Sequence, residues 1–248
     1  MSSSTYVLIT GGNRGLGEAL VTRFLAQPNR TVIAANRDPN HPTSKALDLL
    51  PKGEGSRLIV VKYDAAVEQD AFDVAKTLQT DHGINHLDIV VANAGIFKSY
   101  PPVKDVKVEQ ILEHVQVNVF GVIWLFQATR ELLKKSPNAP IFVPMTSGAS
   151  SLTRQPPVPN AAYGPSKAML NWFGVKINAE EEWLNTFLLD PGFVQTESAN
   201  SAARQFGMEK ATLPVDEATD GLFRVITTST KERDGGNMVF YTGEVLTW

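Results

Sequence analysis

Two kinds of hydrophobic pattern alternate along the chain. Short runs rich in valine and isoleucine predict buried β-strands at residues 6–10, 31–35, 57–61, 87–92, 141–145, 186–189 and 238–241. Between them, apolar residues recur at three- and four-residue spacing, which predicts helices at residues 15–26, 67–79, 109–135, 161–183 and 215–228. This alternation predicts an α/β fold with a doubly wound, seven-stranded parallel sheet that is flanked by helices on both faces.

No feature of the sequence divides these elements between two domains. The stretches richest in proline and glycine, residues 51–55 and 154–160, are too short to be more than surface loops. We therefore expect residues 1–248 to form one Rossmann-type domain, which binds its ligands beyond the carboxyl ends of the strands where the strand order reverses. Pro144 departs from the pattern, because it lacks the N–H that a central strand uses in its ladder.

Composition narrows the classes of function. Hydrophobic residues make up 43% and charged residues 20% of the chain, as in a globular protein with a sizeable core. A formal charge of −3 argues against a nucleic-acid partner, which requires a basic surface. The lack of cysteine excludes disulfides, thiolate metal sites and a cysteine nucleophile. Because the amino-terminal residues carry no secretion signal and no apolar stretch approaches the roughly 20 residues of a membrane span, we expect a cytoplasmic protein without membrane contact.

A glycine-rich segment, Thr10-Gly-Gly-Asn-Arg-Gly-Leu-Gly17, follows the first predicted strand and opens the first helix. Glycine lets the backbone turn tightly and approach a pyrophosphate, whose charge is favoured by the N–H groups and dipole of the helix start. Its spacing resembles the cofactor loop of the short-chain dehydrogenase/reductase family rather than the general G-x-G-x-x-G fingerprint. The segment therefore predicts a dinucleotide site that includes Gly11, Asn13, Arg14, Gly15, Leu16 and Gly17.

The end of the second predicted strand indicates which dinucleotide is bound. An acidic residue there would accept from a free ribose 2'-hydroxyl, whereas a nearby arginine favours a 2'-phosphate. Asn36 occupies the expected acidic position and Arg37 follows it, with Arg14 placed to approach the same phosphate. We therefore expect NADPH/NADP, although a register shifted by one or two residues would make Asp38 the ribose ligand and NADH the cofactor.

The family resemblance implies further cofactor contacts after three other strands. These are Asp64 and Ala65 near the adenine, Asn93, Ala94 and Gly95 in the turn beneath the cofactor, and Pro191, Gly192, Val194 and Thr196 near the carboxamide or phosphate. Asp64 is equally suited to cap the helix expected near Val67, and both interpretations stand.

A tyrosine and a lysine four residues apart carry the strongest chemical signal. Tyr163 and Lys167 share one face of the predicted helix, with Cβ atoms about 5–6 Å apart. An ammonium in that position is expected to lower the pKa of Tyr163 from about 10 toward the working pH, as a general acid requires. Ser147, at the end of the fifth strand, is expected to hold a substrate carbonyl oxygen by a hydrogen bond.

Together with the glycine loop, these residues resemble the catalytic set of the short-chain dehydrogenase/reductase family in the same order along almost the whole chain. The resemblance implies that Asn118 positions Lys167 through water and that Lys167 donates to the nicotinamide ribose. The gap from Ser147 to Tyr163 is longer than the commonest family spacing and contains Pro156-Pro157-Val158-Pro159. We expect this loop to line the substrate.

The expected activity is reduction of a carbonyl group by NADPH, with Tyr163 as the proton donor and without a metal ion. The same residues would serve an alcohol dehydrogenase that works in the oxidative direction. A non-catalytic NADP-sensing module is a further alternative, although such a module would more naturally lack the tyrosine and lysine pair.

Two segments near the amino terminus, residues 5–11 and 32–39, resemble a fungal norsolorinic-acid-ketoreductase-like group within the family. This resemblance implies an aromatic or polyketide-type ketone and a role in secondary metabolism. The apolar wall for such a substrate is expected from Phe97, Tyr100, Leu152, Phe193 and either Phe206 or Met208. Residues 198–213 are the expected substrate lid, and relatives suggest a homodimer or homotetramer formed through the two long middle helices.

Overall fold

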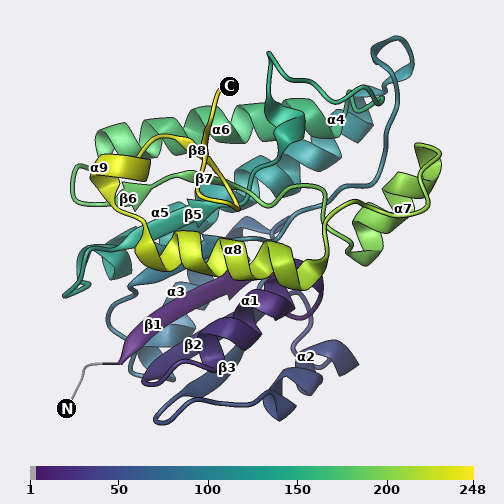
Figure 1. Cartoon of the computed structure of the whole chain (residues 1–248). Coiled ribbons are helices and arrows are strands. Elements are labelled where there is room, and N and C mark those ends of the chain that lie inside the picture. The colour runs from purple at the N-terminus through teal and green to yellow at the C-terminus, as the bar shows by residue number, and fades with distance from the viewer. Residues whose placement is uncertain (1–3) are drawn as a thin grey trace.

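The computed structural model describes residues 4–248, so the predictions that concern residues 1–3, namely the start of the domain and of the amino-terminal segment, lie outside the described residues. The main sheet has six parallel strands in the order β3-β2-β1-β4-β5-β6 (Figure 1). They are β1 (Thr5–Thr10), β2 (Arg30–Asn36), β3 (Arg57–Lys62), β4 (Ile89–Ala92), β5 (Ile141–Pro144) and β6 (Asn185–Thr186). The strand order reverses between β1 and β4, and this brings the residues that follow these two strands to one crevice.

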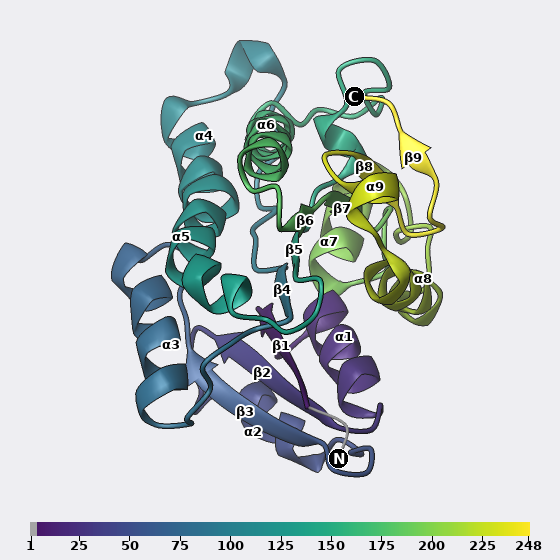
Figure 2. The same ribbon diagram turned by 90° about the vertical axis from the view of Figure 1, so that its left-hand side faces the viewer.

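Helices cover both faces of the sheet, as Figure 2 shows. One face carries α3 (Glu68–Thr80), α4 (Val108–Val115), α5 (Gly121–Lys134) and α6 (Tyr163–Glu180), and the other carries α1 (Gly15–Leu25) and α8 (Val215–Thr228). Successive side chains of β1 point to opposite faces of the sheet, and a hydrophobic core lies on each face. Leu8 packs in the cluster of the first face, while Val7 and Ile9 pack in the cluster of the second.

The prediction of one seven-stranded sheet is wrong for the last two expected strands. The expected sixth strand is divided at Phe187 into β6 and β7 (Leu188–Asp190). The expected seventh strand, β8 (Met238–Phe240), pairs with β7 in a separate three-stranded sheet that ends in the antiparallel β9 (Val245–Leu246).

Pro144 explains the division. The N–H groups of Ile141 and Met145 donate to Asp88 and Ala92 on the β4 side, at 2.9 and 3.0 Å. Because alternate residues of a parallel strand donate to opposite neighbours, the nitrogen of Pro144 faces β6 and β7, where it has no hydrogen to donate. The ladder therefore stops after Phe142 and resumes only at a single bridge between Met145 and Leu189.

Several short elements have no counterpart in the predicted pattern. They are α2 (Pro42–Ala46), α7 (Glu197–Gln205), α9 (Lys231–Asp234) and single turns at Leu47–Leu49, Val103–Asp105 and Gly148–Ser150. The long middle helix expected at residues 109–135 is also interrupted, because a π-helical turn, Gln116–Phe120, separates α4 from α5. Single π-helical turns within α-helices are frequent at functional sites.

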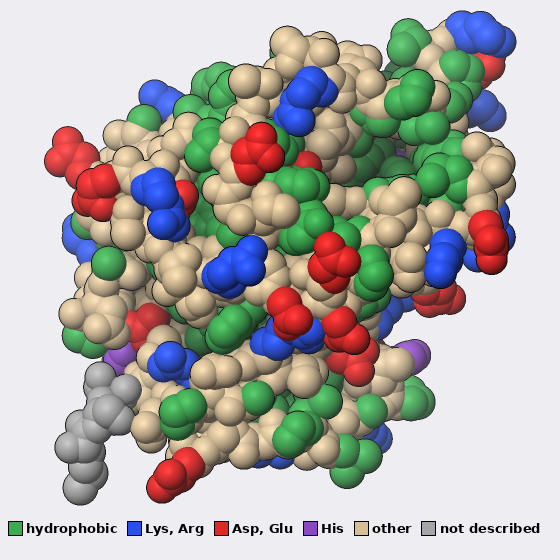
Figure 3. Space-filling model, in the orientation of Figure 1, with side chains coloured by type: hydrophobic (Ala, Val, Ile, Leu, Met, Phe, Trp, Pro, Cys, Tyr) green, Lys and Arg blue, Asp and Glu red, His purple; other side chains and the backbone are tan. Residues whose placement is uncertain are grey.

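The helical run from Val108 to Lys134 is long and apolar enough, by length and composition, to cross a membrane. The expectation that no apolar stretch approaches this length was therefore wrong. Part of its apolar surface belongs to the core, since Val119, Val122 and Leu125 are buried in the cluster beneath α3 and α5, whereas Val108 and Leu112 are exposed. On the face of the molecule seen in Figure 3, acidic and basic side chains are interspersed and form no extended basic surface.

Candidate active site

The glycine loop adopts a conformation that requires glycine. Gly11 and Gly15 have φ values of +64° and +55°, in the left-handed region that other residues rarely adopt. A Cβ atom on Gly17 would lie 2.0 Å from the carbonyl oxygen of Gly11, so the first turn of α1 packs directly against the loop. Leu16 points into the core beneath the loop and packs with the cluster on the α1 face.

The loop presents a helix start to the crevice. No side chain caps α1, whose N-cap residue is Arg14, and this leaves the first turn open to an anionic group. The amide of Asn93 donates to the carbonyl oxygens of Thr10 and Gly11, at 2.9 and 3.3 Å, and fixes the turn after β4 against the loop. The backbone N–H of Ala94 donates to Thr10 Oγ1 at 2.9 Å. These contacts hold the residues after β1 and β4 as one surface.

A second turn meets the glycine loop from the β7 side. Pro191 is buried and Gly192 has a φ of +77°, so the chain reverses directly after β7. Val194 is 3% exposed, and the methyl group of Thr196 lies 3.3 Å from where a Cβ on Gly15 would stand. The hydroxyl of Thr196 also caps α7 by accepting the N–H of Ala199.

The end of β2 fits an adenosine ribose. Asn36 is the last residue of the strand and is fully buried, and its Nδ2 donates to Ser44 Oγ at 3.3 Å. Its Oδ1 has no hydrogen-bond partner within residues 4–248. Buried polar atoms are normally paired, so this oxygen suits a ribose hydroxyl donor. The residues present therefore fit a dinucleotide.

Asp38, the alternative ribose ligand, makes a contact within its own turn. Asp38 lies two residues beyond β2, and its Oδ1 accepts the N–H of Asn40 within its own turn. Arg14 and Arg37 are exposed beside the crevice. The sequence analysis missed that Asn13 donates to Thr43 Oγ1 at 2.7 Å, a contact that joins the glycine loop to the start of α2.

The residues after β3 resolve one of the open alternatives. Asp64 Oδ1 accepts the N–H of Ala66, and α3 begins after Val67 with no side-chain cap. The interpretation of Asp64 as a helix cap was therefore wrong, and its contact with adenine stays a prediction. Ala65 packs closely under the start of α5, because a Cβ on Gly121 would lie 2.4 Å from the carbonyl oxygen of Ala65.

The three residues expected to carry the chemistry converge in the crevice. Tyr163 is the first residue of α6, and Ser147 is the N-cap of the turn that follows β5. The Ser147 hydroxyl lies close enough to the phenol of Tyr163 to lower its pKa. Lys167 Nζ lies 5.9 Å from the centroid of the Tyr163 ring and donates to the carbonyl oxygen of Met145 at 2.7 Å.

Asn118 faces the same crevice from the π-helical turn. Its amide donates to the carbonyl oxygen of Ile96 at 3.0 Å and accepts the N–H of Ile96 at 2.8 Å. A Cβ on Gly95 would lie 3.1 Å from Asn118 Oδ1 and 3.8 Å from Lys167 Nζ. The amide and the ammonium therefore flank the same backbone position, and the water relay between them stays a prediction.

The pKa of Tyr163 departs from its ordinary value in the opposite direction to that expected. Burial raises the pKa of the phenol, and the nearby Ser147 hydroxyl lowers it only in part. Burial also lowers the pKa of the Lys167 ammonium to about 8, against the negative charge of Asp190. The helical spacing predicted that Tyr163 and Lys167 lie close together, but it did not predict that both groups are buried away from solvent. Tyr163 therefore holds its proton at neutral pH, the state that a proton donor requires.

A buried polar network that the sequence analysis missed lies behind Ser147. Thr146 Oγ1 donates to Asn171 Oδ1, and Asn171 Nδ2 donates to Ser150 Oγ at 2.7 Å. Ser150 Oγ in turn donates to the carbonyl oxygen of Ser147 at 2.6 Å. Asn171 lies one helical turn beyond Lys167 on the same buried face of the helix. A polar residue at that position was the signal in the sequence that could have indicated the network.

Aromatic rings cover Tyr163 on the lid side. Phe97 lies with its centroid 4.4 Å from that of Tyr163, Tyr100 lies 4.5 Å from Phe97, and Phe206 lies 5.1 Å from Tyr100. The hydroxyl of Ser198, in α7, donates to the carbonyl oxygen of Phe97 at 3.3 Å. Part of the predicted lid therefore contacts the predicted wall.

The other expected members of the wall make no ring contact with this cluster among the described residues. Leu152 is 73% exposed and Met208 is 37% exposed, and their contact with a substrate stays a prediction. Phe193 is partly buried, and its carbonyl oxygen accepts the N–H of Leu213.

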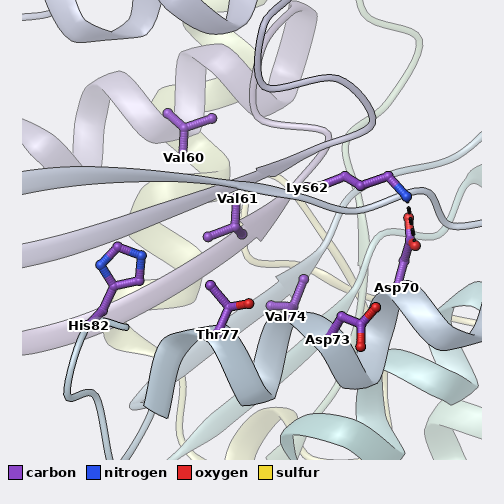
Figure 4. A pocket seen from close by; sticks show the side chains of 8 residues that line it. All are labelled: Val60, Val61, Lys62, Asp70, Asp73, Val74, Thr77 and His82. Carbon is purple, nitrogen blue, oxygen red and sulfur yellow. Dashed lines mark hydrogen bonds and ion pairs between the residues drawn. The ribbon is translucent and has the colours of Figure 1, made fainter. Parts of the chain in front are cut away.

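A pocket outside this crevice lies between β3 and α3 (Figure 4). It is lined by Val60, Val61, Lys62, Asp70, Asp73, Val74, Thr77 and His82, none of which was predicted as a site residue. Its one lysine is paired with Asp70 at 2.8 Å. Within the part of the chain that the structure describes, no cluster of three or more His, Asp or Glu side chains is arranged to hold a metal ion.

Comparisons with known proteins find similar sequences and a similar fold. The family model described as short chain dehydrogenase matches residues 5–206. The norsolorinic acid ketoreductase of Dothistroma septosporum is 40% identical, covering 100% of this chain and 94% of the relative. That of Aspergillus parasiticus is 37% identical, covering 98% and 91%. The structure of NADPH-bound carbonyl reductase from chicken fatty liver has a TM-score of 0.86 at 23% identity, covering 99% of this chain and 100% of that one.

Proposed function

The chain belongs to the short-chain dehydrogenase family, and from this premise we propose that it is an NADPH-dependent ketoreductase for aromatic or polyketide-type ketones of secondary metabolism. One observation carries the proposal. Ser147 lies close to the phenol of Tyr163 and Lys167 lies over the tyrosine ring, beyond the carboxyl end of β5, the strand next to β4. A location in the cytoplasm and assembly into a homodimer or homotetramer remain predictions beside it.

The proposed reaction assigns a task to each of these side chains. When bound, NADPH supplies the hydride that reduces the carbonyl carbon. Ser147 Oγ donates a hydrogen bond to the carbonyl oxygen and stabilises the charge that develops there. Tyr163 Oη, protonated at neutral pH, gives its proton to the same oxygen. Lys167 supplies the positive charge that stabilises the resulting phenolate, and Asn118 holds the backbone at Ile96 beside it.

NADPH is the proposed cofactor because Asn36, with its unpaired buried oxygen, replaces an acidic residue and because Arg14 and Arg37 lie exposed beside it. The carbonyl reductase from chicken fatty liver, which shares this fold and has NADPH bound in its structure, supports the choice.

Replacing Arg37 with Ala is expected to lower the ratio of kcat/KM for NADPH to that for NADH about tenfold, because a charge-assisted contact with the 2'-phosphate is lost. Steady-state kinetics with both cofactors measure the ratio. Arg224→Ala, which removes an exposed arginine of α8, should leave it unchanged. The assignment is contradicted if the wild-type kcat/KM for NADH equals or exceeds that for NADPH. It is also contradicted if Arg37→Ala leaves the ratio of the two kcat/KM values unchanged.

The substrate class is testable with a panel of ketones followed by NADPH absorbance. The names of the fungal relatives and the ring cluster of Phe97, Tyr100 and Phe206 support a large aromatic ketone. We expect kcat/KM for multi-ring aromatic ketones to exceed that for small aliphatic aldehydes about 100-fold. Activity confined to the aldehydes contradicts the proposed substrate. NADPH binding without turnover of any carbonyl would instead favour the non-catalytic sensing module.

A further inference from the structure

A buried carboxylate that the proposed reaction does not use lies beside the predicted catalytic residues. Asp190 ends β7 and is 3% exposed. Leu188, two residues earlier and so on the same face of the strand, packs against Gly174 of α6. Asp190 therefore faces α6, the helix that carries Tyr163 and Lys167.

The carboxylate joins two turns. Asp190 Oδ1 accepts the N–H of Gly192 at 3.0 Å, in the turn predicted to meet the nicotinamide end of the cofactor. The backbone of Gly148 also lies beside the carboxylate, since a Cβ on Gly148 would lie 3.3 Å from Asp190 Oδ2, and its N–H lowers the pKa of Asp190. Gly148 directly follows Ser147. One side chain thus connects the turn expected to hold the substrate to the turn expected to hold the cofactor.

The same carboxylate is a counter-charge for the lysine. Lys167 Nζ donates to the carbonyl oxygen of Met145, which is bridged to Leu189, the residue before Asp190. The charged or titratable groups around Asp190 are Lys167 and Tyr163 of α6 and Arg154 of the preceding loop. The negative charge of Asp190 raises the pKa of both Lys167 and Tyr163.

We propose that Asp190 is a positioning residue of this active centre, which holds the Ser147 turn against the Gly192 turn and keeps Lys167 protonated. This inference rests on the proposed function, since the groups it positions are those of the carbonyl reduction. Burial raises the pKa of Asp190, and the nearby N–H groups of Gly192 and Gly148 and the charges of Arg154 and Lys167 lower it only in part.

Asp190→Asn removes the charge with almost no change in shape. Without the carboxylate, the pKa values of Lys167 and Tyr163 both fall. The alkaline limb of the pH profile of kcat/KM should therefore move to lower pH, by about one unit, whichever of the two groups governs it. An alkaline limb that stays at the wild-type pH overturns the inference.

The chain offers a matched control. Asp88 is also 3% exposed and accepts a backbone N–H, that of Tyr6 at 2.8 Å, but it directly precedes β4 and so lies at the amino end of a strand, whereas Asp190 lies at a carboxyl end. Asp88→Asn is expected to lower the unfolding temperature without moving the alkaline limb. If it moves the limb as far as Asp190→Asn does, the effect is one of stability and the inference fails.

A second measurement separates this inference from the proposed function. In protein labelled with ¹³C at the lysine side chains, NMR follows the titration of Lys167, whose signal is identified by its loss in Lys167→Met. We expect Lys167 to titrate at lower pH in Asp190→Asn than in the wild type, and Asp190→Ser gives the same comparison if the asparagine variant does not fold. A shifted titration without turnover of any ketone would refute the proposed function alone, and an unshifted titration in an active enzyme would refute the role of Asp190 alone.

Discussion

Replacing Tyr163 with Phe is expected to lower kcat about 10³- to 10⁴-fold while the affinity for NADPH stays within about twofold of the wild type. The phenol hydroxyl is the group that meets Ser147, and burial keeps it protonated at neutral pH by raising its pKa. Removing it leaves the ring packed against Phe97 and leaves Lys167 bonded to the carbonyl oxygen of Met145. The loss should therefore fall on the proton transfer and not on the fold.

Single-turnover kinetics and a fluorescence titration with NADPH separate these two quantities. Tyr6→Phe is a suitable control, because Tyr6 lies in β1, pairs with Thr31, and packs edge-on against His86 at 4.7 Å, far from the crevice. This control should retain wild-type kcat. If Tyr163→Phe keeps a near-normal kcat, another group gives the proton and the mechanism proposed for this family member fails.

The order of the elements was predictable because burial imposes a period on the sequence. Val7, Leu8 and Ile9 alternate between two helical layers, and an apolar run of this kind is characteristic of a strand that is covered on both sides. The convergence of the glycine loop with Ser147, Tyr163 and Lys167 follows from the same topology, since all of them lie beyond the carboxyl ends of parallel strands.

What escaped prediction depends on contacts between distant segments. Pro144 was recognised as anomalous, but only the pairing of β5 with its two neighbours shows that its missing N–H falls on the side of β6 and β7. The direction of the pKa shift of Tyr163 depends on how much solvent the folded chain removes, which spacing along a helix does not report. Asp190 did carry a signal, as an acidic residue at the end of an otherwise apolar strand.

The site combines rigid and adaptable parts in separate places. Glycine contacts and the Asn93 amide fix the predicted dinucleotide side through backbone atoms, which leave little room for variation. The predicted substrate side is built from aromatic rings, in which Phe97 and Phe206 approach Tyr100 from a loop and from the end of α7. We expect cofactor use to tolerate few substitutions, whereas substrate choice should change readily with the rings.

Gly17 makes the closest of these backbone contacts, with Gly11. Gly17→Ala is therefore the substitution with the largest expected effect on cofactor affinity. A Cβ at this position would lie 2.0 Å from the carbonyl oxygen of Gly11 and 2.6 Å from Asn93 Nδ2, so α1 must move away from the loop. The helix start and the loop would then no longer present one anion-binding surface. We expect the Kd for NADPH, measured by fluorescence titration, to rise at least about 100-fold, or ~3 kcal/mol.

Gly83→Ala is the control that separates the loss of NADPH affinity in Gly17→Ala from a general loss of stability. Gly83 has a φ of +65° and no heavy atom within 4 Å of where its Cβ would stand, and it lies in the loop after α3. Its replacement should cost about 1–2 kcal/mol of unfolding free energy through backbone strain alone and leave the Kd for NADPH unchanged. Should Gly17→Ala bind NADPH within about threefold of the wild type while folding normally, the glycine loop is not the pyrophosphate site, and the dinucleotide must be bound elsewhere.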